Sequence, residues 1–417
     1  MQRWVVGALL ALGTVCAVSP ARAEETADEF AAIDAHALAA PASVTGDVAW
    51  LSAYLVEPAR TDREKARAIF RWITRNIAYD VSLEASSRDP EVVLTRRSDI
   101  CLGYAVLFKA LAEAAGMKAE IIFGHSSKFR PGLPDESGPW VNHAWNAVEV
   151  EGRWQLVDCS WGAGHRDQQG AFAWKFCPHY FLTPPEIFVY DHFPENPSWQ
   201  LLAWPISKDE YLQRVRVRPA FFECGLRLVS HDSATIETDG PLTVTIGAPA
   251  ETVLVAALYR DGREVEDGYT FTQREAESFV IHARFPSAGA YVLRVFARRQ
   301  DDPGDDYAWA LDYTVQARSG SASDGGFPKA YGSFLTRSCR LEQALSQTLP
   351  AGNAVEFSLT VPRAEEVVVA SGGSFSRLPA EGARFTGKVA VSPGPVLVFA
   401  RFAGQPLYEG LLQYTAR

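Results

Sequence analysis

Long apolar runs are almost absent from this sequence of 417 residues. The run from Trp4 to Val18 spans 15 residues, fewer than the roughly 20 that a membrane-crossing helix needs, and no other stretch could cross a membrane. An excess of basic residues is also lacking, because 40 lysines and arginines are outnumbered by 50 acidic residues and the formal net charge is −10. We therefore expect no stable membrane span and no nucleic-acid partner, since nucleic-acid binding depends on basic patches.

Metal-binding motifs are missing as well. The sequence contains no CxxC or HExxH spacing and no EF-hand loop, so we expect no metal and no cofactor. Cysteine is scarce, with six residues in the whole chain.

The first 23 residues have the pattern of a secretory signal peptide. A short basic start that includes Arg3 precedes the apolar run, and Ala21-Arg22-Ala23 is a small-x-small ending that predicts cleavage after Ala23. The alternatives are a retained anchor, for which the run is short, and lipid attachment at Cys16, which Val15 disfavours because a small residue is needed there. We expect a periplasmic or secreted protein.

Composition divides the rest of the chain into three parts. Residues 24–215 contain most of the tryptophans, and residues 216–318 (module 1) consist of short alternating strands. A Ser/Gly/Asp linker at 319–326 precedes residues 327–417 (module 2), which have strands of the same kind. Similar segments recur in the same order at an offset of roughly 100 residues, the length of an immunoglobulin-like sandwich. We predict two related all-β immunoglobulin-like sandwich modules after an N-terminal domain.

Two helices are predicted in the N-terminal domain. The first opens with a capping box, Thr61 to Glu64. The second begins at Cys101, continues at helical apolar spacing to Ala115 and stops at Gly116. A helix N-terminus lowers the pKa of a thiol and leaves a backbone N–H for an oxyanion. Cys101 is thus a predicted nucleophile, with a buried structural cysteine as the alternative.

A predicted hairpin brings an imidazole and a carboxylate together. The strand that begins at His143 is followed by a turn at Glu151-Gly152 and a return strand that ends at Asp158. Two registers are open, with either Trp145 or His143 opposite Asp158. Both put the imidazole and the carboxylate on one face, because side chains alternate with a period of two. With Cys101 they supply the groups of a Cys-His-Asp relay.

These segments resemble the transglutaminase-like superfamily. Cys101-Leu-Gly-Tyr-Ala is similar to its nucleophile helix, and His143-Ala-Trp-Asn and Asp158-Cys-Ser-Trp-Gly are similar to its histidine and aspartate segments. Tyr180-Phe-Leu-Thr-Pro-Pro and His192-Phe-Pro resemble the kyphoscoliosis peptidase branch. The resemblance extends over roughly residues 60–260.

The resemblance implies an α+β papain-like, transglutaminase-like core in residues 24–215 and acyl transfer at amide bonds of a protein or peptide substrate. Cys101 would form a thioester, His143 would take the thiol proton and give it to the leaving amine, and Asp158 would orient the imidazole. Water as acceptor gives a peptidase and an amine gives a transglutaminase, and both stay open. The alternative function is a non-catalytic scaffold or protein-binding module that uses the transglutaminase-like core and its sandwich modules to bind envelope proteins.

Other residues near the relay have weaker predicted roles. Trp145 and Trp161 flank it and are candidate substrate-binding residues, with ordinary core packing as the alternative. Tyr79 is the nearest upstream candidate for a second oxyanion donor. The loop between Ser126 and Val141 is a candidate border of the substrate cleft, or only a solvated loop.

Four cysteines besides Cys101 follow the predicted cleavage site, and in an oxidising compartment they can form two disulfides. We predict that Cys159 pairs with Cys177, because this bridge stays inside one domain, and that Cys101 stays free. Cys224 and Cys339 lie at equivalent starts of the two modules and either pair or remain as buried thiols.

Overall fold

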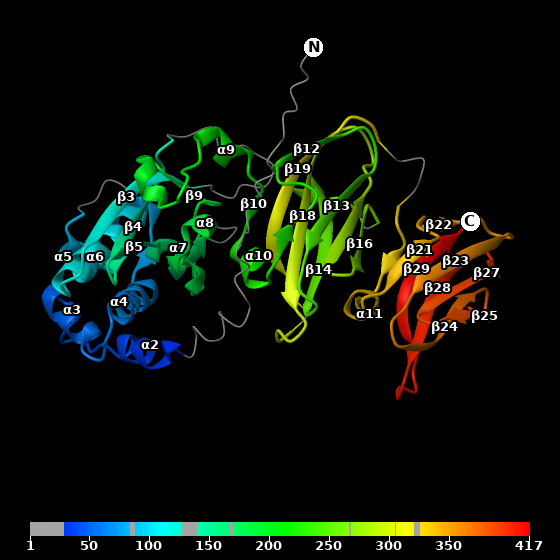
Figure 1. Cartoon of the computed structure of the whole chain (residues 1–417), viewed down its shortest axis with the longest axis horizontal. Helices are drawn as coiled ribbons and strands as arrows, with labels where there is room; N and C mark the ends of the chain where they lie inside the picture. The colour runs from blue at the N-terminus through cyan, green and yellow to red at the C-terminus, as the bar shows by residue number, and fades with distance from the viewer. Residues whose placement is uncertain are drawn as a thin grey trace, which may run out of the picture.

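The computed structural model describes residues 29–83, 88–126, 140–166, 170–266, 268–304, 306–320 and 326–417. The predicted signal peptide and most of the loop between Ser126 and Val141 lie outside these ranges. Three parts follow one another along the long axis of the molecule, first a part with helices and a sheet and then two all-β parts (Figure 1). Within the described ranges, no helix combines the length and the apolar character that a membrane crossing requires.

The N-terminal part is an α+β unit. Its helices are α2 (Ala31–Leu38), α3 (Val48–Val56), α4 (Asp62–Asn76), α5 (Pro90–Arg96), α6 (Cys101–Ala114), α7 (Cys159–Ala163), α8 (Pro185–Phe188) and α9 (Lys208–Gln213), with short 3-10 helices η1 (Val81–Leu83), η2 (Pro178–Tyr180) and η3 (Pro197–Gln200). Its strands are β1 (Ala78–Tyr79), β2 (Ser98–Asp99), β3 (Ala119–Ser126), β4 (His143–Val150), β5 (Arg153–Val157), β6 (Gly164–Arg166), β7 (Phe172–Trp174), β8 (Phe181–Thr183) and β9 (His192–Pro194).

Local signals in the sequence account for the two main helices. The capping box of α4 is present, with Thr61 and Glu64 satisfying each other's backbone N–H groups. α6 begins at Cys101 and ends before Gly116, which takes a positive φ of 77° that glycine adopts without strain. Both helices contribute their apolar faces to one buried cluster, so each predicted helix is confirmed.

The central sheet is antiparallel, in the order β8-β5-β4-β3-β9. β4 and β5 pair with Val150 opposite Arg153 and Asn146 opposite Val157. This is the first of the two predicted registers, in which position 145 faces position 158. Strand β5 ends at Val157, one residue earlier than predicted, and Asp158 instead caps the N-terminus of α7.

The first sandwich consists of the module 1 strands and one short helix. Its elements are β10 (Arg216–Val217), α10 (Pro219–Glu223), β11 (Arg227–Leu228), β12 (Thr235–Thr238), β13 (Leu242–Gly247), β14 (Thr252–Arg260), β15 (Arg263–Glu264), β16 (Thr270–Glu275), β17 (Ser278–Ala283), β18 (Gly289–Arg299) and β19 (Ala308–Ala317). They form a sheet in the order β10-β19-β18-β14-β15, with β12 beside β19, and a second sheet in the order β11-β13-β17-β16.

Module 2 repeats this topology strand for strand. Its elements are β20 (Lys329–Ala330), α11 (Gly332–Thr336), β21 (Arg340–Gln343), β22 (Thr348–Leu349), β23 (Ala354–Thr360), β24 (Ala364–Ser371), β25 (Ser374–Arg377), β26 (Ala380–Glu381), β27 (Arg384–Ala390), β28 (Gly394–Phe402) and β29 (Glu409–Ala416). The sheets run β20-β29-β28-β24-β25, with β22 beside β29, and β21-β23-β27-β26. Even the register shift between Val295 and Phe296 of β18 recurs between Val398 and Phe399 of β28.

The structure contradicts the predicted disulfide. Among the described residues the free thiols are Cys101, Cys159, Cys177, Cys224 and Cys339. Cys159 is buried in the cluster formed around α4 and α6, whereas Cys177 packs against a different cluster beside Trp161. The prediction failed because the spacing of Cys159 and Cys177 along the chain does not show which cluster each side chain enters. Cys224 and Cys339 follow the second alternative and remain buried, each in the core of its own module.

Candidate active site

The candidate nucleophile lies at the N-terminus of α6. Cys101 is the first residue of the helix, and its side chain packs with Ala105 and Ala144. The residue before it, Ile100, has no polar side chain to cap the helix, so the first backbone N–H groups are left for other partners. These donors and the helix dipole favour a thiolate at this position.

A buried ion pair fixes the turn that leads into α6. The Asp99 carboxylate accepts the backbone N–H of Ile100 at 2.7 Å and pairs with the guanidinium groups of Arg88 and Arg96. Gly103 leaves the space that this carboxylate occupies, because a Cβ at position 103 would lie 2.2 Å from Cγ of Asp99. The glycine in the first turn therefore allows the close approach that holds Cys101 in place.

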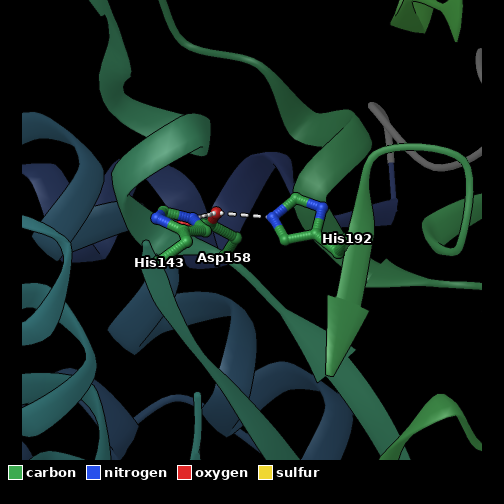
Figure 2. A group of neighbouring side chains, drawn as sticks. All are labelled: His143, Asp158 and His192. Atoms are coloured by element: carbon green, nitrogen blue, oxygen red, sulfur yellow. Dashed lines mark hydrogen bonds and ion pairs between the residues drawn. The ribbon is translucent and has the colours of Figure 1, made fainter. Parts of the chain in front are cut away.

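The structure brings the three predicted relay residues together. The Cys101 thiol hydrogen-bonds the His143 side chain and accepts the backbone N–H of Ala144. His143 Nε2 donates to Oδ2 of Asp158 at 2.7 Å, which leaves Nδ1 for the thiol (Figure 2). Oδ1 of Asp158 accepts the N–H groups of Ser160 and Trp161, at 2.8 and 3.0 Å. The start of α7 thus holds the carboxylate, and the carboxylate holds the imidazole.

These contacts shift the ionisation of all three groups. Burial opposes the Cys101 thiolate, but the charge and hydrogen bond of His143 outweigh it and lower the pKa of the thiol. Burial also opposes the imidazolium, but the Asp158 carboxylate and the Cys101 thiolate raise the pKa of His143 to about 10. Although burial alone would raise it, the pKa of Asp158 lies well below its usual value because His143 and His192 hydrogen-bond the carboxylate. The arrangement favours a thiolate–imidazolium pair.

The other described cysteines have the opposite tendency. Burial raises the pKa of Cys177, Cys224 and Cys339 to about 12, and that of Cys159 well above its usual value. Cys101 is therefore the one thiol among the described residues whose pKa is lowered. A thiolate near neutral pH is expected at this site and not at the others.

Tyr79 adjoins the nucleophile from a separate strand pair. β1 runs parallel to β2, with Tyr79 beside Asp99, two residues before Cys101. The tyrosine hydroxyl donates to the Cys101 thiol and accepts its backbone N–H, while burial, and then the charges of Cys101 and Asp158, raise the pKa of the phenol. The hydroxyl thus stays protonated next to the N–H predicted to hold an oxyanion, where it can act as the second donor.

A second histidine was missed in the sequence. His192 Nε2 lies 3.0 Å from Oδ2 of Asp158, the same oxygen that His143 binds, and its Nδ1 lies 2.6 Å from Oδ1 of Asp191 (Figure 2). His192 is the first residue of β9, which pairs with β3 at the edge of the sheet. The sequence feature that could have indicated this histidine is the dipeptide Asp191-His192, within the segment that resembles the peptidase branch.

The two tryptophans occupy different positions. Trp145 is 1% exposed and packs against His192 and Phe188, so its position favours the packing role over the predicted contact with substrate. Trp161 is partly exposed, its ring centroid lies 5.6 Å from that of His143, and its role in substrate binding stays a prediction.

His143, Asp158 and His192 each offer a possible metal-ligand atom, and these atoms lie within 4.8 Å of one another. The nitrogen–oxygen separations of 2.7 and 3.0 Å are hydrogen-bond lengths. Imidazole nitrogens that donate N–H bonds have no lone pair for a metal ion. We therefore describe the group as a hydrogen-bonded network.

Two family models match the chain. Residues 50–159, which include the three relay residues, match the model described as "Transglutaminase-like superfamily". Residues 208–323 match the model described as "KY-like, immunoglobulin-like domain". The chain carries a transglutaminase-like domain followed by a KY-like immunoglobulin-like domain. The sequence-based expectation of fold and family is thereby confirmed.

Relatives of this transglutaminase-like protein occur in animals. The Homo sapiens protein named kyphoscoliosis peptidase is 33% identical over 269 residues, which cover 63% of this chain and 39% of that protein. The Drosophila melanogaster protein named hillarin is 33% identical over 284 residues, which cover 58% of this chain and 33% of that protein. The chain thus matches well under half the length of these relatives, and the transglutaminase-like domain is compatible with either a cysteine acyltransferase or a peptidase.

Proposed function

We propose that this protein is an exported cysteine acyl-transfer enzyme that cleaves or exchanges amide bonds of a protein or peptide through a thioester on Cys101. The observation that carries the proposal is the buried hydrogen-bonded series from Cys101 to His143 to Asp158, together with the lowered pKa of the Cys101 thiol. A structural cysteine has no need of an imidazole oriented by a buried carboxylate.

The reaction follows from the positions of these groups. The Cys101 thiolate attacks the carbonyl carbon, and the oxyanion that forms accepts hydrogen bonds from the backbone N–H of Cys101 and the hydroxyl of Tyr79. The imidazolium of His143 gives its Nδ1 proton to the leaving amine, and the tetrahedral intermediate collapses to a thioester. His143, now neutral, takes a proton from the acceptor, water or a second amine, which attacks the thioester and releases Cys101.

Export is proposed from the pattern of residues 1–23 and fits a periplasmic or secreted location. If the protein is processed after Ala23, N-terminal sequencing of the mature protein begins at Glu24. A mature protein that still begins at Met1 would contradict the proposed export.

A binding function is the second candidate, and a surface of module 2 favours it. Phe375 and Tyr408 are exposed apolar side chains on the rim of a hollow of about 310 Å³ that Val368 and Phe399 also line. Exposed apolar clusters of this kind mark protein contact sites. A scaffold that binds envelope proteins through the modules would need this surface and no reactive thiol.

Alkylation of the mature protein with iodoacetamide at pH 6–7 separates the two functions. We expect rapid labelling of one thiol that is lost in Cys101→Ala and retained in the matched variant Cys339→Ala, because the pKa of Cys339 is raised to about 12 by burial. Equal, slow labelling of wild type and Cys101→Ala would refute the enzyme and support the scaffold. Mass spectrometry of the products formed from glutamine-containing peptides in the presence of an added amine then separates hydrolysis, which yields a free carboxylate, from transamidation, which yields an amide of the added amine.

A further inference from the structure

Asp158 stands between two imidazoles. His143 and His192 approach the same carboxylate oxygen from opposite sides, from strands β4 and β9 (Figure 2). The chemistry of acyl transfer uses only one of these histidines, because only His143 reaches the thiol. The second imidazole therefore needs a separate explanation.

We infer that His192 is a positioning residue, a buried imidazolium that fixes Oδ2 of Asp158 toward His143 and supplies a positive charge to the relay. The inference rests on the acyl-transfer function proposed above. Both ring nitrogens of His192 face carboxylate oxygens, at 3.0 Å on Asp158 and 2.6 Å on Asp191. Ionised carboxylates only accept hydrogen bonds, so each nitrogen must carry a proton and the ring is a cation.

Asp191, the second carboxylate that pairs with this cation, is itself held by hydrogen bonds. Oδ2 of Asp191 accepts the hydroxyl of Tyr180 at 3.0 Å, and its backbone carbonyl accepts the hydroxyl of Tyr211 at 3.1 Å. The His192 ring stacks on Phe188 with centroids 4.0 Å apart, and its side chain has no solvent exposure. Such a fully paired buried charge is stable where it is and costly to displace.

Charged and titratable groups face the His192 ring from several elements of the described chain. Asp158 faces it from the start of α7 and Asp191 from the preceding residue. His143 on β4 has its ring centroid 5.3 Å away, and Tyr180 on η2 has its centroid 5.9 Å away. Burial, and to a smaller extent the charge of His192, lowers the pKa of His179, also on η2, to about 4, so this imidazole is neutral. From Cys101 to Asp191 the charges therefore alternate between negative and positive.

Loss of the His192 charge shifts the pKa values of Cys101 and His143 in a predictable direction. Removing a positive charge disfavours the Cys101 thiolate and favours the His143 imidazolium, so the pKa of each group rises. Both limbs of the pH–rate profile then move to higher pH, by about one unit. Loss of the hydrogen bond to Oδ2 is a second effect, because the carboxylate is then held by α7 alone and His143 loses part of its orientation.

Two variants separate charge from hydrogen bond. His192→Gln removes the charge but keeps an N–H donor for Asp158, whereas His192→Phe removes both. The control is His179→Gln, which alters a nearby buried histidine that does not touch Asp158. For each full-length mature variant we would measure the rate of Cys101 alkylation by iodoacetamide from pH 4 to 10, and kcat and KM on a peptide amide.

We expect His192→Phe to lower kcat by roughly 10- to 100-fold with KM little changed, since hydrogen bonds to charged groups are lost. His192→Gln should recover most of this rate at its own optimum, with both limbs of the profile still shifted to higher pH. His179→Gln should match wild type. If His192→Phe does not fold, the shift of the alkylation profile in His192→Gln alone decides the question.

Alkylation profiles of the His192 variants that superimpose on wild type would overturn the inference, as would a uniform loss of rate without a shift in pH. The proposed function is refuted by a different result, namely that wild-type Cys101 shows no rapid labelling at pH 6–7. The two failures are thus distinguished by the wild-type protein.

Discussion

The most specific structural prediction concerns Gly103, two residues after the nucleophile. A methyl group at this position would lie 2.2 Å from Cγ and 2.6 Å from Oδ2 of Asp99, distances that neither side chain tolerates. Asp99 is fully buried and pairs with Arg88 and Arg96, so it cannot rotate away without breaking these contacts. We expect Gly103→Ala to destabilise the transglutaminase-like domain and to displace Cys101.

The magnitude follows from opposing effects. Overpacking a tight site costs about 1–3 kcal/mol, and the disturbed buried ion pair adds to this cost. Replacing a helical glycine by alanine returns about 1 kcal/mol of helix propensity. A net loss of about 2–3 kcal/mol should lower the Tm of a domain of this size by roughly 4–12 °C.

The assay is thermal unfolding followed by circular dichroism, together with the rate of iodoacetamide labelling at pH 6.5. Gly46→Ala is the matched control, because a Cβ at Gly46 meets nothing within 4 Å. The double variant Asp99→Gly with Gly103→Ala should be no less stable than Asp99→Gly alone, because Cβ and Cγ of Asp99, which would lie 2.3 and 2.2 Å from the new methyl group, are then both absent. A Gly103→Ala protein with wild-type Tm and labelling rate would refute the reasoning, as would strictly additive losses in the double variant.

Three further predictions test the site. Cys101→Ala should abolish acyl transfer with little change in stability, and His143→Ala should be nearly as inactive because relay members act as a unit; both are checked by turnover and by Tm. Tyr79→Phe should lower kcat by roughly 100-fold with KM little changed, as expected for a lost oxyanion donor, and an unchanged kcat would remove Tyr79 from the mechanism. The raised pKa of His143 contributes stability that is fully present below pH 6.5 and lost as pH rises through about 10. The wild-type Tm should therefore fall between these pH values more than that of His143→Ala.

Those parts of the fold that depend on neighbouring residues could be predicted from the sequence. The capping box at Thr61 and the glycine at position 116 mark helix ends by local chemistry, and both ends lie where expected. The turn at Glu151-Gly152 fixes the hairpin, and its φ values of 51° and 76° are those of a tight turn that needs left-handed residues. The expected placement of His143 near Asp158 follows from this register.

Features that depend on distant segments could not be predicted. His192 reaches Asp158 from a strand of three residues, too short to show an alternating pattern, and it arrives there by pairing with β3. The disulfide prediction failed for a similar reason, since spacing along the chain does not show which cluster a side chain enters. Trp145 alternates correctly with its neighbours, but only the packing of Phe188 and His192 shows that it is fully covered.

The polar network around the candidate site also connects the transglutaminase-like domain to module 1. Arg218, which precedes α10, lies near enough to Tyr180 and Asp191 for their charges to act on it, while burial lowers its pKa to about 10. Its guanidinium also lies 4.3 Å from the ring centroid of Trp309 on β19. Since Tyr180 hydrogen-bonds Asp191, and Asp191 holds His192, a short series of contacts leads from the first sandwich to Asp158.

The first sandwich also contacts the transglutaminase-like domain directly. Phe222 of α10 stacks on His179 and packs against Tyr190, and the backbone N–H of Ala234 donates to the carbonyl of Gln213 at 2.7 Å. The apolar contacts bury surface that the transglutaminase-like domain would otherwise expose, and the charge of Arg218 interacts with that of Asp191, whose carboxylate pairs with His192. Module 1 therefore packs against the segment that carries Tyr190 and Asp191, next to His192.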